Sequence, residues 1–443
     1  MTASRELGLG VLDAALIVVG SIVGAGIFLV SPYVAQHVGS PAGFLGAWVL
    51  GGGVALAGAL SNGELGGLFP HSGGEYVYLR EAYGPAFGFL SGWVSFWIAF
   101  PGSIATLAAG LGATLAPLFG WTDARAPVLI GALAISGLTL VNAFGLRPGK
   151  WTQNVLSLAK LAVFAVLLAL GVAWPHPGVP TGLFPFFAGR DTAHGIAAAL
   201  VPVLFAYAGW NAATYVGGEM RDPTRSLGRA LTLGTALCIL LYLLINAVYL
   251  RAIPVEQLST IKEPARLAAM RLGGKAAAAV LSPLVALCVT SSIQASVLVG
   301  PRIYRAMALD GLFFRAFGRL HPKTQVPLVA LSAQSLVAMV LLVSGSFDQL
   351  LTFATSPIVA FSTLTVAAVI VLRLRRPHAP REFRVPGGWL LPLMFVVVNV
   401  WVLWNVLASG AREARIGLAI VASGVPAYAV FRALTRRSEV LGR

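Results

Sequence analysis

The chain contains 443 residues, of which 57% are hydrophobic and only 11% are charged, and it carries a formal net charge of +15. A soluble globular domain has about 25% charged residues, so this composition excludes a water-soluble fold, which would lack the polar surface to cover itself. The 50 glycines and 10 tryptophans fit the enrichment of Gly within membrane helices and of Trp at membrane interfaces.

Apolar segments follow one another along nearly the whole chain. Each is about 20 residues or more, the length that a helix needs to cross about 30 Å of hydrocarbon. We predict an all-α polytopic membrane protein with about twelve transmembrane helices, because only helices and closed barrels satisfy the backbone in lipid. The predicted spans are residues 10–35, 42–68, 84–117, 127–145, 152–173, 193–219, 229–250, 273–308, 327–345, 348–373, 389–408 and 414–432.

The basic residues are divided unevenly between the two sides of this bundle. With a cytoplasmic N-terminus, 21 of the 31 Lys and Arg residues fall on the cytoplasmic side and nine on the other, while Lys160 lies within a span. The asymmetry follows the positive-inside rule and predicts a multi-pass protein of the cell membrane with both termini cytoplasmic. The net charge therefore reflects topology and anionic lipid head groups. Without a compact basic domain, we expect no nucleic-acid partner.

The cysteines and histidines give no indication of a metal or redox centre. Cys238 and Cys288 both fall inside apolar spans, where a free thiol behaves as a small core residue. No disulfide framework or metal-ligand spacing is present. The six histidines are scattered, mostly in loops, without the His/Glu spacing of a zinc hydrolase. We expect no metal and no cofactor, and an intramembrane enzyme is disfavoured.

Two of the predicted spans are interrupted. The first contains GSIVGAGIF (residues 20–28), and the sixth contains FAYAGWNAATYVGGE (residues 205–219) after Pro202. Gly weakens a helix interior by about 1 kcal/mol relative to Ala, and Pro removes a backbone donor. The spans begin two consecutive sets of five, and paired interruptions at corresponding positions of two halves point to a transporter binding site. The alternative is close helix packing through small residues, for which Gly20 and Gly24 have the spacing.

Six stretches, in order along the chain, resemble the L-type amino-acid transporters of the amino acid–polyamine–organocation superfamily. They cover the two interruptions, the segment between spans two and three, and three segments of the second half: residues 20–28, 59–93, 205–231, 300–314, 321–327 and 375–387. The resemblance implies a five-plus-five inverted repeat with broken helices one and six and two further C-terminal helices. It places repeat one at about residues 8–175, repeat two at about 190–375 and the last helices at about 388–433.

The resemblance also implies secondary active transport of amino acids, by exchange or uptake without sodium. We expect small or medium neutral amino acids moved by alternating access. A proton-coupled permease, including one for cationic amino acids or polyamines, remains an alternative. So does an amino-acid sensor that keeps the binding site without turnover. Besides the amino-acid substrate and membrane lipid, the sequence indicates no partner, and it leaves the oligomeric state open.

The proposed substrate site is made of backbone. An amino acid brings a carboxylate and an ammonium, and an unpaired charge is expensive at the bilayer midplane. Unwinding would direct the amides at the start of a half-helix toward the carboxylate and free carbonyls for the ammonium. The candidate residues are Ile22, Val23, Gly24, Ala25, Gly26, Phe205, Ala206 and Ala208. From the resemblance, Phe205 is also expected to gate the outer side of the site.

Lys160 is the most informative single residue of the spans. It lies about two turns inside helix five, where a buried ammonium is costly unless it is paired or neutralised, and snorkelling is the alternative. The resemblance places a lysine near the unwound part of helix one and near Ser291 and Ser292. We expect this ammonium to take the place that sodium holds in related carriers. The serines have a structural alternative, since such hydroxyls often bond to the preceding turn.

Three acidic residues near the ends of spans receive looser assignments. Glu64 and Glu219, together with Arg221, are candidates for ion pairs at the inner gate. Glu75 belongs to the segment between helices two and three and is interpreted as cytoplasmic scaffolding.

Overall fold

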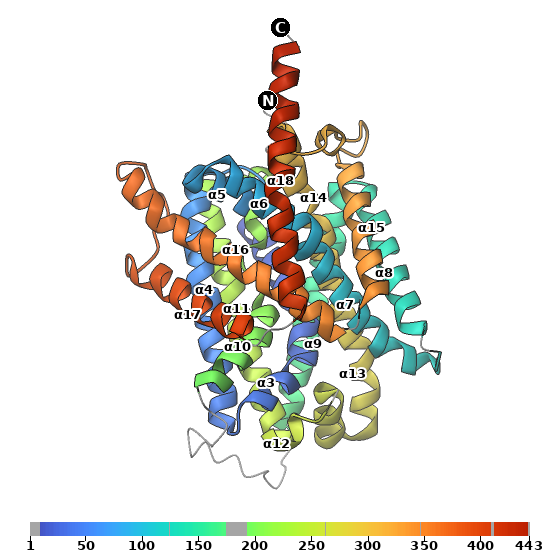
Figure 1. Cartoon of the computed structure of the whole chain (residues 1–443). Coiled ribbons are helices and arrows are strands. Elements are labelled where there is room, and N and C mark those ends of the chain that lie inside the picture. The colour runs from blue at the N-terminus through green and yellow to red at the C-terminus, as the bar shows by residue number, and fades with distance from the viewer. Residues whose placement is uncertain are drawn as a thin grey trace.

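The computed structural model describes residues 9–123, 125–173, 193–261, 263–345, 347–408 and 412–441. Across these ranges the chain is helical, and the only extended pairing is a single bridge between Leu9 and Met220. Figure 1 shows the helices packed as one upright bundle, with α18 (Arg412–Leu441) reaching beyond it. The prediction of an all-α fold is therefore confirmed.

Twelve helical segments account for the predicted spans in the described part of the chain. Eleven are long and apolar enough to cross a membrane, and the shorter apolar helix α15 (Leu328–Ser344) adds one more. The others are α1 with α2 (Val11–Ile22, Ala25–Leu29), α4 (Pro41–Leu68), α6 to α7 (Pro85–Val94, Phe100–Leu115), α8 (Ala126–Ala143), α9 (Leu146–Ala173), α10 with η3 (Ala193–Tyr207, Ala212–Glu219), α11 (Pro223–Ala252), α13 with α14 (Pro264–Val299, Pro301–Leu309), α16 (Phe347–Arg375), α17 (Leu390–Ala408) and α18.

The helices meet closely where their sequences are rich in glycine. The helix α4 begins where Pro41 follows Ser40, whose side chain accepts a hydrogen bond from the Gly43 amide at 2.8 Å, an N-cap arrangement. Its far half packs along α11. A Cβ on Gly63 would lie 2.8 Å from the Cα of Gly228, so the two backbones can touch here because residue 63 is glycine.

Shorter helices lie between the spans. They are α3 (Ser31–His37), α5 (Glu75–Tyr83) and α12 (Val255–Leu258). The residues just before the predicted eighth span are themselves largely helical, since α13 starts at Pro264 and continues past non-helical Gly274. The loop at residues 174–191 lies outside the described residues. The repeat boundaries stay a prediction.

One side of the bundle collects α5, α14 and the far end of α18 (Figure 1). We call it the basic side, because α16 also ends there with Arg373 and Arg375. Leu9, the first described residue, pairs with Met220 next to Glu219, whose partner Arg302 belongs to α14, so the start of α1 lies on this side as well. The positive-inside rule predicts that it faces the cytoplasm.

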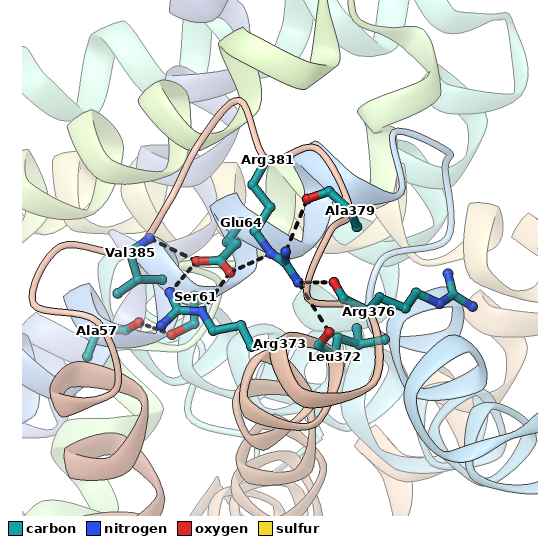
Figure 2. Close-up of polar contacts among 9 residues, drawn as sticks. All are labelled: Ala57, Ser61, Glu64, Leu372, Arg373, Arg376, Ala379, Arg381 and Val385. Carbon is teal, nitrogen blue, oxygen red and sulfur yellow. Dashed lines mark hydrogen bonds and ion pairs between the residues drawn. The ribbon is translucent and has the colours of Figure 1, made fainter.

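A buried ion cluster joins α4 to the end of α16 and to the loop that follows it (Figure 2). The Glu64 carboxylate, 1% exposed, is 2.9 Å from Arg373 Nε and 3.1 Å from Arg381 Nε. It also accepts a hydrogen bond from the Val385 amide at 2.9 Å. Arg381 in turn donates to the carbonyls of Leu372 and Arg376, the last turn of α16. The cluster thus fixes the loop after α16 against α4.

We expect Glu64→Ala to destabilise the fold strongly. Removing one partner of a buried ion pair costs about 3–5 kcal/mol, because it leaves uncompensated charge, and here two guanidiniums would lose their carboxylate. The measurement is the melting temperature of the purified protein in detergent. Glu382→Ala is the matched control, because its ion pair with Arg225 is exposed and such pairs contribute little. Equal melting temperatures for the two variants would contradict a stabilising role for the cluster.

Candidate substrate cavity

The first transmembrane helix is broken at Val23 and Gly24. The helix α1 ends at Ile22, Val23 is extended, and Gly24 has φ −134° and ψ −147°, after which α2 begins at Ala25. The amides at the start of α2 therefore lack intrahelical partners. The side chain of Ala25 lies outside the described residues.

The sixth span is broken in the same way. The helix α10 ends at Tyr207, Gly209 has φ +107°, and the chain continues as the 3-10 helix η3 from Ala212. Residues other than glycine rarely adopt such a positive φ, so Gly209 is what allows the helix to end here. The prediction of broken helices one and six is confirmed.

The two breaks lie against each other. A Cβ on Gly26 would lie 2.7 Å from the Cα of Ala206, and a Cβ on Gly209 would lie 2.6 Å from the Cβ of Ser21. Each interruption thus supplies a glycine against which the other packs. Helix breaks and close packing, weighed above as alternatives, therefore occur together here, with Gly26 and Gly209 at the contact.

Tyr242 of α11 joins the two breaks. Its hydroxyl lies 2.6 Å from the Ile22 carbonyl oxygen and 3.0 Å from the Ala206 carbonyl oxygen, and the side chain is fully buried. A hydroxyl has one proton to donate, so the two carbonyls share it. The sequence analysis missed Tyr242, because a tyrosine in an apolar span has no local signal that separates it from core packing.

Lys160 and Ser292 bind the other side of the first break. The Lys160 ammonium, 0% exposed, donates to the Gly20 carbonyl at 2.7 Å and to Ser292 Oγ at 2.8 Å. Ser292 Oγ also lies 2.9 Å from the carbonyl oxygens of both Gly20 and Val23. Snorkelling to the interface is therefore wrong for Lys160. The neighbouring Ser291 is equally buried, but its hydroxyl has no hydrogen-bond partner among the described residues.

A cavity of about 130 Å³ opens beside the two breaks. That volume is small beside the roughly 300–1,000 Å³ of sites for drug-sized ligands, so it suits a small molecule. Of the predicted substrate residues, those that line it are Ile22, Gly24, Gly26, Phe205, Ala206 and Ala208. Val23, the other predicted substrate residue whose side chain is described, is not among the lining residues. Of the predicted coupling residues, Ser292 lines the cavity, whereas Lys160 and Ser291 do not.

Other parts of the cavity wall come from elements that the sequence analysis did not assign to the site. A π-helical turn, η1 (Ser95–Ala99), contributes Ser95 and Ala99, and such turns are frequent at functional sites. Helix α16 contributes Ser362, and α5 contributes Glu75. Glu75, interpreted above as scaffolding, is thus part of the cavity wall.

Ion pairs on the basic side hold the half-helices that lead to the cavity. Glu219 at the end of η3 pairs with Arg302 of α14, with Oε1 2.9 Å from Nε. Asp13 at the start of α1 pairs with Lys150 of α9 at 2.8 Å. Glu64 pairs with Arg373 and Arg381. The acidic residues predicted for the inner gate therefore have separate arginine partners, none of which is Arg221.

Two broken helices that meet beside a small cavity, within a bundle of long apolar helices, are the arrangement typical of secondary transporters. The family model described as amino acid permease matches residues 9–423, and the chain belongs to this family. Transport of amino acids through a membrane is therefore its general activity, in a family of transporters and not of enzymes.

Characterised relatives resemble the chain over nearly its full length. The serine/threonine exchanger SteT of Bacillus subtilis (strain 168) is 30% identical over 427 residues, which is 96% of each chain. The b(0,+)-type amino acid transporter 1 of Mus musculus is 28% identical over 97% of this chain and 89% of its own. The human cystine/glutamate transporter is 30% identical over 94% of this chain and 83% of its own.

Gly26→Ala tests the contact between the breaks. The new Cβ would meet the backbone of Ala206 at 2.7 Å, and backbone cannot move aside without displacing the half-helices. We expect amino-acid uptake into proteoliposomes to fall at least tenfold. The control is Gly137→Ala on α8, where a Cβ meets nothing within 4 Å and Ala is the better helix former. Full uptake by the Gly26 variant would show that the close contact is dispensable.

Proposed function

We propose that the protein exchanges small or medium neutral amino acids across the cell membrane by alternating access and without sodium. The observation that carries this proposal is the meeting of two unwound helices at a cavity of about 130 Å³. The relatives support it, since one is named a serine/threonine exchanger and another a cystine/glutamate transporter.

In this proposal the backbone binds the part that all amino acids share. The amides at the start of α2, at Gly24, Ala25 and Gly26, receive the carboxylate at the favourable end of the half-helix dipole. The carbonyls near Ile22 and Val23, and those of Phe205, Ala206 and Ala208, receive the ammonium. Carbonyl oxygens have two lone pairs, so Ile22 and Ala206 can accept from the substrate while they accept from Tyr242.

Phe205 is the proposed gate. Its side chain is 7% exposed and lines the cavity at the end of α10, directly before the break. A ring at this position can cover a bound amino acid with a rotation of its side chain, without a movement of the helix.

Lys160 is the proposed internal cation. Its ammonium reaches the carbonyl of Gly20 and the hydroxyl of Ser292, which are oxygen ligands of the kind a sodium ion would take. Through these hydrogen bonds the ammonium braces α1 against α9 and α13. Transport then needs no external cation to complete the site.

Two other functions are separated from exchange by experiment. A proton-coupled permease, including one for cationic amino acids or polyamines, would accumulate substrate under a pH gradient with nothing inside. An amino-acid sensor would bind substrate without turnover.

The same proposal places both termini in the cytoplasm, because the ion-paired arginines gather on the basic side.

Counterflow in proteoliposomes is the first test. Vesicles loaded with unlabelled amino-acid mixtures should take up labelled alanine without sodium or a pH gradient, and empty vesicles should not. Entry into empty vesicles driven only by an acidic exterior would replace exchange by proton-coupled uptake. Binding of alanine without entry under any condition would favour the sensor.

Lys160→Met should reduce counterflow by at least a factor of ten, because the first break loses the bonds to Gly20 and Ser292. Thr290→Val on the same helix as Ser292 is the control, since its hydroxyl bonds only to the Ala286 carbonyl one turn earlier. Full counterflow with an unchanged pH profile in the Lys160 variant would remove both the bracing role and any proton role of this lysine.

A further inference from the structure

Glu75 is a buried carboxyl in the cavity wall with neutral neighbours. It is 7% exposed and lines the cavity. Asn211 Nδ2 and Ser362 Oγ donate to its Oε1 at 2.9 and 3.2 Å, and the Tyr215 hydroxyl is a third hydrogen-bond partner. Asn211 and Tyr215 belong to the second break and the helix η3 after it, and Ser362 to α16, so the carboxyl lies where α5, η3 and α16 meet beside the cavity.

The charged groups around Glu75 are paired elsewhere. On α5, Arg80 pairs with Asp310 and Glu81 with Arg376. On α16, Arg373 pairs with Glu64 and Arg375 donates to the Ala82 carbonyl. Glu219 at the end of η3 pairs with Arg302, and α6 has no titratable residue. The titratable groups that interact with Glu75 are the phenols of Tyr78 and Tyr215. No ion pair reaches Glu75 within the described ranges.

A buried carboxyl group that has no cation beside it favours its neutral, protonated form. The segment α5 lies between the membrane spans, and burial raises the pKa of Glu75 from 4.5 to about 7, against the lowering effect of the bonds from Ser362, Asn211 and Tyr215. Those donors can remain in place in either protonation state. A side chain that is 93% covered also leaves little room for a bulky ammonium, whereas a proton needs none.

We propose that Glu75 is a proton-binding site in the wall of the substrate cavity, which takes up a proton from water when an amino acid fills the cavity. The proposal rests on the proposed function, since the ligand that excludes water is the amino acid. The proton goes from water to a carboxylate oxygen of Glu75 and returns to water when the cavity opens. Amino-acid affinity is then linked to pH.

The sign of the linkage follows from the direction of the shift. If amino-acid binding favours protonated Glu75, binding takes up a proton only at pH values at which Glu75 of the free protein is ionised. Those are pH values above its pKa of about 7. Affinity should therefore be constant at lower pH and fall up to about tenfold per pH unit above it. Glu75→Gln imitates the protonated form and should keep the higher affinity at all pH values.

Infrared difference spectroscopy tests the proton site without any substrate. Titration of the purified protein between about pH 5 and 9 should show a carboxylic-acid carbonyl band that disappears with a midpoint near 7. The band should be absent from Glu75→Gln and retained in Glu81→Gln, a matched change on the same helix. If Glu75→Gln does not fold, Glu75→Asp replaces it, and the band must shift. A band that neither variant changes, or a carboxyl ionised throughout, would overturn the proposal.

Calorimetry in buffers of different ionisation enthalpy then tests the linkage to substrate. At about pH 8 the wild type should take up close to one proton per alanine bound, and Glu75→Gln none. No uptake by the wild type would overturn the linkage. Loss of binding in Glu75→Gln for cationic amino acids alone would make Glu75 a substrate ligand instead. Failure of the wild type to bind any amino acid would contradict the proposed function, while the infrared result still decides the proton site.

Discussion

The structure depends on one constraint: backbone polar groups inside a membrane need partners, and two helices here are broken where lipid offers none. Side chains from neighbouring helices supply those partners. Tyr242 reaches the carbonyls of Ile22 and Ala206, and Lys160 with Ser292 reaches those of Gly20 and Val23. The breaks are therefore stable features of the fold and not unwound defects. The cavity forms because these side chains keep both helices unwound next to each other.

Acidic residues have different kinds of partner on the basic side and in the cavity wall. On the basic side, Glu64 and Glu219 each have arginine partners, which hold α4, α16, η3 and α14 together. In the cavity wall, Glu75 has only neutral donors. A paired charge resists change, whereas an unpaired one can gain or lose a proton at little cost. The ion pairs thus stabilise the packing of helices on the basic side. Glu75, in contrast, can change its protonation state as the proposed substrate enters and leaves the cavity.

The sequence was sufficient to predict the helices and both breaks, because apolar length and misplaced glycines are local signals. Gly24 and Gly209 stand at the breaks, and Lys160 lies beside the first. It was insufficient for partners that depend on tertiary packing. Tyr242 is 220 residues from Ile22, and Glu75 lies in a polar segment that resembles an ordinary loop. Ser291 and Ser292 are neighbours on one helix and so point about 100° apart, and only the fold shows which one meets the break.

A site made from backbone has a consequence for specificity. In the proposed site, amides and carbonyls at the two breaks contact only the carboxylate and ammonium that every amino acid carries, so they would not distinguish substrates. Discrimination would then come from the side chains that line the cavity, which include Phe205 and Trp210 beside the second break and Ser95, Glu75 and Ser362 of η1, α5 and α16. Relatives at about 30% identity are named for different amino acids, as expected if side chains of the cavity set the specificity. Glu75, the proposed proton site, bonds to the side chains of Asn211 and Ser362, so a proton can bind there without replacing a backbone contact of the proposed substrate site.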